Sequence, residues 1–142
     1  MMRVRKLAGR AGMAALGLFA GVAACGDVQV PVVVLGDRPT AVERFAAEEL
    51  AGELGKCLGV KPVVASESAS LPRPRLYVGA TKASAALGAR GEGWPVDGVR
   101  LKSVADGAVL DGDPARAPIY AVDLYLEKYC GVRWWTDRKS VV

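Results

Sequence analysis

Two segments of the chain carry apolar residues at the spacing of an amphipathic helix. Within 42–58 and again within 119–130, apolar positions recur every three or four residues. Since an α-helix has 3.6 residues per turn, each segment is predicted to form a helix with one buried face. Gly59 and Gly131 follow directly, and glycine readily adopts the left-handed conformation that ends helices. The predicted buried positions are Val42, Phe45, Ala46, Leu50, Leu54, Cys57 and Leu58 in the first helix, and Ile119, Val122, Leu126, Tyr129 and Cys130 in the second.

The starts of the helices carry signals of their own. Thr40 and Glu43 have the spacing of a capping box, in which a hydroxyl and a carboxylate satisfy backbone N–H groups at the helix end. Asp113 followed by Pro114 predicts the start of the second long helix, because proline is favoured at the first helical position. Thr81 is expected to cap a short alanine-rich helix that ends near residue 87.

Short apolar or alternating runs predict the strands. Residues 28–35 form a β-branched run broken by Pro31, which predicts either an edge strand or a strand that starts after the proline. Asp106-Gly107 indicates a hairpin turn, and the segment after Gly131 is expected to be a short exit strand. With further strands at 61–65, 75–79, 99–103 and 108–110, we predict an α/β (α+β) fold. It is a two-layer sandwich, with a mixed sheet of about five strands and both main helices on one face.

The first 24 residues resemble an export signal rather than a part of the domain. A basic start is followed by an uncharged, apolar run over 11–24, which is short for a membrane span and typical of a signal peptide. The run ends in Val22-Ala-Ala-Cys25, which resembles a bacterial lipobox, so Cys25 would be the lipid attachment point. We therefore expect a lipoprotein signal peptide at 1–24, a lipidated tether at 25–29 and one domain at 30–142. The protein would be exported and membrane-anchored, in the periplasm or at the cell surface. An ordinary signal peptide with an incidental cysteine is the alternative.

Removal of this leader changes the charge balance. The whole chain has 19 basic and 15 acidic residues, and the leader holds four of the basic ones. The remaining chain thus carries 15 of each and has no net charge. The basic character belongs to the leader, so nucleic acid is not an expected partner.

Catalytic and metal-binding patterns are missing from the sequence. It contains no histidine, which excludes Ser-His-Asp catalysis and histidine-based metal sites. Glu48 and Glu49 are adjacent on a helix and diverge, so they do not form a glycosidase acid pair. Asp111 and Asp113 fit a turn followed by a helix cap better than a calcium loop. We predict no catalytic residue, no metal and no cofactor.

The two cysteines other than Cys25 have similar positions. Cys57 and Cys130 each fall in the last turn of a predicted helix, on its apolar side. A disulfide is permitted in an exported protein. Two buried free thiols are the favoured interpretation, because burial suits a cysteine on an apolar face.

The segment Arg133-Trp134-Trp135 is the candidate contact site. Aromatic faces pack well on sugar rings, so these residues could form a sugar platform or contact another domain. In the simpler interpretation, one tryptophan is in the core, the other covers an interface, and Arg133 pairs with a helix carboxylate.

Three segments resemble the N-terminal domain of family-67 α-glucuronidases and related glycoside hydrolases. They are Ala-Ala-Glu-Glu-Leu at 46–50 with Gly59, Leu-Tyr-Val-Gly at 76–79, and 120–135, which ends in Lys-Tyr-Cys-Gly-Val-Arg-Trp-Trp. The chain is also similar to the second domain of β-hexosaminidases and to the N-terminal domain of α-N-acetylglucosaminidases. One departure is Ala117, which stands where the family pattern Arg-Gly-x-x-Tyr-Ala has glycine.

This resemblance implies an ancillary role. In those enzymes the domain precedes a catalytic (β/α)8 barrel that carries the catalytic residues, so none transfers to this chain. The implied function is that of the non-catalytic N-terminal domain of an exported, lipid-anchored glycoside hydrolase in polysaccharide breakdown. Its partners would be the barrel of the parent chain, absent here, an oligosaccharide, and the membrane through the lipid. The alternative is a stand-alone surface lipoprotein that binds glycan or protein.

Overall fold

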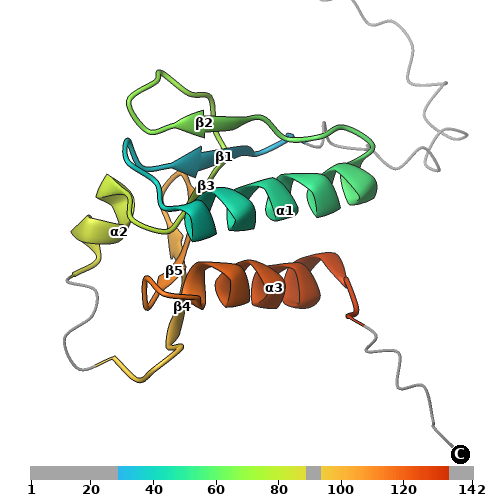
Figure 1. Cartoon of the computed structure of the whole chain (residues 1–142). Coiled ribbons are helices and arrows are strands. Elements are labelled where there is room, and N and C mark those ends of the chain that lie inside the picture. Colours follow the sequence, from blue (N-terminus) through green and yellow to red (C-terminus); the bar gives the residue numbers. More distant parts are fainter. Residues whose placement is uncertain (1–28, 89–93, 135–142) are drawn as a thin grey trace, which may run out of the picture.

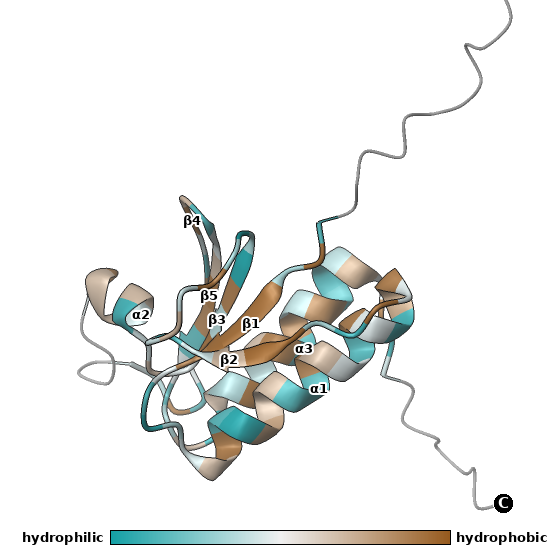
Figure 2. Cartoon of the chain, turned by 90° about the horizontal axis from the view of Figure 1, so that it is seen from above, coloured by the Kyte–Doolittle hydropathy of each residue, from teal (hydrophilic) through white to brown (hydrophobic). Residues whose placement is uncertain are grey.

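The computed structural model describes residues 29–88 and 94–134 (Figure 1). The described chain forms a five-stranded sheet in the order β2-β1-β3-β5-β4, with α1 and α3 on one face and α2 on the other (Figures 1 and 2). The predicted α/β two-layer fold is therefore confirmed. The elements are β1 (Val32–Leu35), α1 (Ala41–Leu58), β2 (Val64–Ser66), β3 (Arg75–Val78), α2 (Lys82–Ala86), β4 (Val99–Val104), β5 (Gly107–Gly112) and α3 (Ala117–Cys130).

The sheet is mixed, as predicted. Strands β2, β1, β3 and β5 run parallel, and β4 pairs with β5 as an antiparallel hairpin. Strand β1 begins after Pro31 and lies between β2 and β3, so the edge-strand alternative is wrong and the second alternative is right. Proline lacks the N–H that a paired central strand needs, which is why the strand starts beyond it.

The main core lies between the sheet and the two long helices. In Figure 2 the strands are largely hydrophobic, whereas the helices show hydrophobic and hydrophilic residues side by side. Leu50, Leu110 and Leu126 are fully buried at the centre of this layer. The core residues are Val33, Leu35, Leu76, Val78 and Leu110 from the sheet, and Ala46, Ala47, Leu50, Ala51, Leu54, Ala121, Val122 and Leu126 from the helices.

Of the predicted core positions, Val42 is half-buried outside this layer, and three others are exposed. Phe45 is 59% exposed, Tyr129 is 61% exposed, and Cys57 is exposed as well. In α1 the small residues Ala46, Ala47 and Ala51 take the buried positions and let the helix pack closely on the sheet, which leaves Phe45 on the outer flank. Cys57 and Tyr129 lie in the last turns of their helices. The prediction that these three side chains are buried is therefore wrong.

The capping box of α1 is formed as predicted. Thr40 Oγ1 accepts from the Glu43 N–H at 3.2 Å, and Glu43 Oε2 accepts from the Thr40 N–H at 2.8 Å. Gly59 ends the helix in the left-handed conformation with φ 75°. We expect Thr40→Ala to lower the free energy of unfolding by about 1 kcal/mol, because it leaves the Glu43 N–H without its hydrogen-bond acceptor. Urea denaturation measures this, and an unchanged midpoint would contradict the assignment.

Helix α3 ends where predicted but starts later, and the strand expected after it is not formed. It begins at Ala117 rather than at Pro114, and Pro118 lies in its first turn. Asp113 instead organises the preceding turn, where its carboxylate accepts from the Ala115 N–H at 3.1 Å. Gly131 ends the helix with φ 68°, as predicted, and the Val132 N–H donates to the Leu126 carbonyl. Residues 131–134 form no strand, so the predicted exit strand is absent from the described part of this segment.

Candidate functional site

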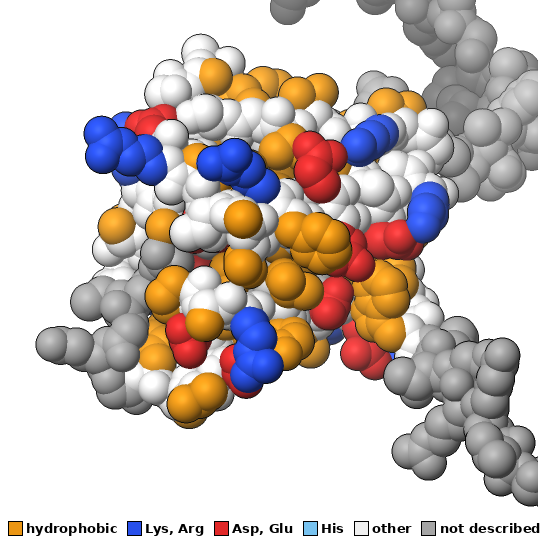
Figure 3. Space-filling model, in the orientation of Figure 1, with side chains coloured by type: hydrophobic (Ala, Val, Ile, Leu, Met, Phe, Trp, Pro, Cys, Tyr) orange, Lys and Arg blue, Asp and Glu red, His pale blue; other side chains and the backbone are white. Residues whose placement is uncertain are grey.

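The outer face of α3 exposes apolar side chains. Tyr120 and Leu124 are one turn apart and are 41% and 42% exposed. Glu127 continues the same face, and the exit segment (residues 131–134) follows it. Figure 3 shows hydrophobic side chains gathered over the two long helices, with acidic groups between them. We use the name "α3 face" for Tyr120, Leu124 and Glu127 together with Arg133 and Trp134 of the exit segment.

The structure describes two of the three predicted contact residues, Arg133 and Trp134. Arg133 donates to Glu127 Oε1 at 2.8 Å, which confirms the simpler interpretation that it pairs with a helix carboxylate. Trp134 is 48% exposed and is not a core residue. Trp135 and the predicted lipid attachment point Cys25 lie outside the described residues. The ion pair ties the exit segment to α3, so Trp134 is held near an exposed apolar surface.

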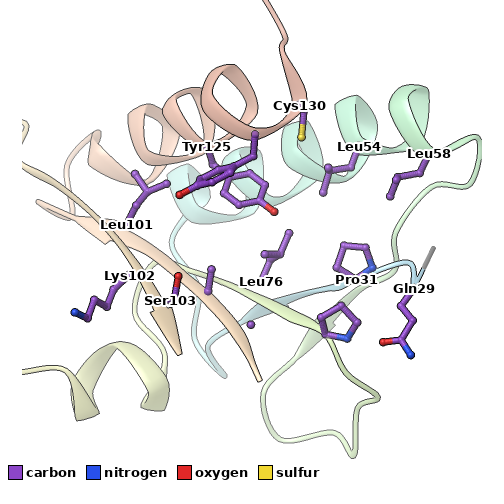
Figure 4. A pocket seen from close by; sticks show the side chains of 14 residues that line it. Gln29, Pro31, Leu54, Leu58, Leu76, Leu101, Lys102, Ser103, Tyr125 and Cys130 are labelled. Atoms are coloured by element: carbon purple, nitrogen blue, oxygen red, sulfur yellow. The ribbon is translucent and has the colours of Figure 1, made fainter. Parts of the chain in front are cut away.

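A groove of about 450 Å³ opens where the parallel strands begin, between the sheet and the last turns of α1 and α3 (Figure 4). The rings of Tyr125 and Tyr129 lie 5.1 Å apart by centroids, and Tyr125 lies above Leu76 and Pro31 in the groove (Figure 4). Among the described lining residues, Lys102 is the charged one. The lining is Gln29, Pro31, Leu54, Leu58, Pro74, Leu76, Leu101, Lys102, Ser103, Gly107, Ala108, Tyr125, Tyr129 and Cys130.

The groove has the chemistry of a binding surface rather than of an acid–base site. Burial raises the pKa of Tyr125 above its ordinary value, and the nearby Cys130 and Tyr129 add to this. Its hydroxyl therefore stays protonated at neutral pH and can act as a hydrogen-bond donor. The groove could not be predicted from the sequence, because strand starts and helix ends come together only in the folded chain.

Cys57 and Cys130 are unbonded thiols. The interpretation that both are free agrees with this, but Cys57 is exposed rather than buried and Cys130 is half-buried. Burial raises the pKa of the Cys130 thiol, and the charge of Cys57 adds to this effect. The two sulfur groups thus lie within electrostatic reach of each other.

Carboxylates face one another between α1 and α3. Burial raises the pKa of Glu49, with repulsion from Asp123 and Glu53 as further causes, and burial raises the pKa of Asp123 as well. Because the pKa of each carboxyl group is raised in the folded state, its ionisation disfavours folding. This loss of stability is absent at low pH, where both groups are protonated, and it is complete once the pH exceeds the folded-state pKa of both groups. Glu48 points to solvent, where it pairs with Lys61 at 3.2 Å.

We expect Asp123→Asn to stabilise the protein at pH 7 by roughly 0.5 kcal/mol, because it removes a charge that is unfavourable to bury and that repels the Glu49 carboxylate. The gain should disappear at about pH 3, below the unfolded pKa of both carboxyl groups, where native and variant are equally uncharged. Urea denaturation at both pH values measures this. Glu48→Gln is the control and should give no gain at pH 7. A stabilisation that is the same at both pH values would refute the electrostatic cause.

A buried ion pair on the α2 side of the sheet was missed by the sequence analysis. Asp111 is fully buried in β5, and Arg100 of β4 donates to both of its oxygens, from Nε at 2.8 Å and from Nη2 at 2.6 Å. The Ser84 hydroxyl donates to Asp111 as well. The interpretation of Asp111 as a turn residue is thus wrong. Arg100 also donates to the Ser84 carbonyl at 3.1 Å and lies 5.3 Å from the centre of the Trp94 ring. The pair holds α2 against the sheet.

Glu43 is a second buried carboxylate with a structural role. It is 2% exposed, closes the capping box of α1, and accepts from the Ala80 N–H at 2.8 Å. It thereby joins the start of α1 to the loop after β3. Both buried carboxylates, Glu43 and Asp111, lie toward the carboxyl ends of the parallel strands, where α/β folds commonly place ligands. In this protein, both carboxylates accept hydrogen bonds from groups of the protein itself.

No group of three or more potential metal ligands is found among the described residues, and none of the helices in this part of the chain is long and apolar enough to cross a membrane. The sequence matches no protein-family model, and a search of curated proteins finds no match.

Proposed function

We propose that residues 30–142 are the non-catalytic N-terminal domain of an exported, lipid-anchored glycoside hydrolase of the α-glucuronidase or hexosaminidase type. The observation that carries this proposal is the α3 face. It coincides with the segment that most resembles those enzymes, 120–135. There Tyr120, Leu124 and Trp134 remain 41–48% exposed. Exposed apolar side chains grouped on one element are typical of a surface that another domain covers.

The position of the α3 face suits a contact between domains. The exit segment leaves α3 beside it, and the Arg133–Glu127 ion pair keeps that segment on the helix. The described chain thus leaves the domain at Trp134 beside an apolar surface, on the way to a barrel that would follow Val142. Interfaces between domains combine such apolar residues with a polar rim, which Glu127 and Arg133 would supply.

The lipid anchor and the polysaccharide substrate belong to the same proposal. The lipobox-like Val22–Cys25 supports export and attachment to a membrane, in the periplasm or at the cell surface. The catalytic acids would lie in the barrel, and this domain would brace that barrel at the edge of the substrate cleft. The barrel and the lipid would be its permanent partners. An oligosaccharide would be the substrate of the complete enzyme.

A stand-alone surface lipoprotein that binds glycan or protein is the second candidate. The observation that favours it is the exposed Trp134 next to Arg133, since a tryptophan face and a guanidinium together suit a sugar ring. In this case the α3 face would bind its ligand directly, without a barrel.

Affinity chromatography of the chain on immobilised xylan and chitin fragments separates the two candidates. The ancillary-domain proposal predicts no hydrolysis and no specific retention. Trp134→Ala and Trp135→Ala are the test variants, and Phe45→Ala removes an exposed aromatic ring from α1 as the control. Retention that is lost in either tryptophan variant and kept in Phe45→Ala would contradict the proposal and favour the glycan-binding lipoprotein.

A further inference from the structure

The two long helices end together, and each carries a thiol in its last turn. Helices α1 and α3 run in the same direction, side by side on the sheet (Figure 1). Cys57 lies two residues before the helix-ending Gly59, and Cys130 lies directly before Gly131. Both thiols are free, and they are the cysteines of the described chain.

The helix register places these thiols opposite each other. Two turns earlier, Glu49 of α1 and Asp123 of α3 are close enough for the charge of one to act on the other. Cys57 is eight residues beyond Glu49, and Cys130 is seven residues beyond Asp123. At 1.5 Å per residue these steps advance about 12 Å and about 10.5 Å along the two helices. Seven residues complete almost two full turns, so Cys130 returns to the flank of Asp123, whereas eight residues pass two turns by about 80°, so Cys57 lies between the flank of Glu49 and the buried side of α1.

The electrostatics agree with this placement. Burial raises the pKa of the Cys130 thiol, and the charge of Cys57 adds to this. Their surroundings differ, because Cys57 is exposed whereas Cys130 is half-buried beside the groove. Cys57 is therefore the thiol that an oxidant in solution reaches first.

We propose that Cys57 and Cys130 form an intramolecular disulfide when the protein meets a disulfide oxidant. The Cys57 thiolate attacks one sulfur of the oxidant, which releases one thiol and leaves a mixed disulfide on Cys57. The Cys130 thiolate then attacks the Cys57 sulfur and expels the second thiol. The protein loses two electrons and two protons, and the oxidant disulfide is reduced to two thiols. This proposal goes beyond the assigned function and does not depend on it.

The bridge would tie the ends of α1 and α3 together. Leu58 and Cys130 both line the groove, so the cross-link would fix the relative position of two of its walls. The exit segment starts at Gly131, the next residue after Cys130, and would gain a rigid anchor. A cross-link between positions this far apart in sequence also restricts the unfolded chain strongly.

Oxidation of the full chain with glutathione disulfide tests this proposal. A Cys25→Ser background leaves Cys57 and Cys130 as the two thiols of the chain. The expected product is a monomer that has lost two hydrogens, carries no glutathione, and resists alkylation until it is reduced. It should melt roughly 10 °C higher than the reduced form, given the length of the closed loop.

Single-cysteine variants provide the controls. Cys57→Ser and Cys130→Ser, each in the same background, should instead take up one glutathione or stay open to alkylation. They should show no rise in melting temperature on oxidation. If the chain with both thiols yields only glutathione adducts or cross-linked dimers, the proposal is overturned.

Discussion

Arg100→Met is expected to lower the free energy of unfolding by about 3–5 kcal/mol, because it leaves the Asp111 carboxylate buried without its cation. Asp111 has no exposed surface, and Arg100 supplies two of its hydrogen bonds. The substitution also removes the bond from Arg100 to the Ser84 carbonyl and the contact with the Trp94 ring. Denaturation in urea measures the loss.

The chain offers a matched control for this experiment. Arg116 binds Asp97 with the same two-pronged geometry, at 3.1 Å and 2.7 Å, but its side chain is 60% exposed. Arg116→Met should cost less than about 1 kcal/mol, because water screens and solvates an exposed pair. The double variant Arg100→Met/Asp111→Asn removes the buried charge and should recover part of the loss. Equal effects at Arg100 and Arg116 would show that burial does not set the energy of the pair.

Gly79→Ala is expected to cost roughly 3 kcal/mol. Gly79 has φ 72°, where a side chain is strained. A Cβ there would also collide with the Glu43 side chain, which caps α1 and accepts from the Ala80 N–H. The cost therefore combines backbone strain of about 1–2 kcal/mol with the loss of a helix cap, which is worth about 1 kcal/mol.

Gly59→Ala separates these two contributions. Gly59 has nearly the same backbone angle, φ 75°, but an added Cβ would meet no atom within 4 Å. It should show the strain alone, about 1 kcal/mol. Circular dichroism during thermal unfolding of both variants measures the difference. If Gly59→Ala costs as much as Gly79→Ala, the contact with Glu43 has no energetic role.

The features that could be predicted from the sequence are those set by neighbouring residues. Thr40 and Glu43 are three positions apart and form their capping box within one helical turn. Gly59 and Gly131 end their helices because glycine tolerates the left-handed conformation. The periodicity of 42–58 and 119–130 correctly indicated two helices with a face on the sheet.

The buried ion pair could not be predicted because it depends on the hairpin register. With Asp106 and Gly107 as the two turn residues, Lys102 would stand opposite Asp111. The structure instead pairs Val104 with Gly107, so Arg100 stands opposite Asp111. Gly107 is a strand residue, and a Cβ on it would collide with the Arg75 carbonyl of β3. The turn residues are therefore Ala105 and Asp106, one residue earlier than the Asp106-Gly107 motif indicates.

The candidate site was predicted in part. Arg133 pairs with a helix carboxylate as one interpretation required, because Glu127 is near in sequence and lies on the outer face of α3. The exposure of Phe45 was missed, since periodicity marks a helix face but does not show how close the helix lies to the sheet. The groove under Tyr125 was also missed, because it forms between elements that are far apart in sequence.

The central claim is that this chain is an ancillary domain whose α3 face packs against a catalytic barrel on the same polypeptide. Determination of the coding sequence beyond the Val142 codon tests it most directly. The account predicts an open frame of several hundred codons with the alternating strand and helix pattern of a (β/α)8 barrel. A stop codon directly after Val142 would contradict it and favour the stand-alone lipoprotein.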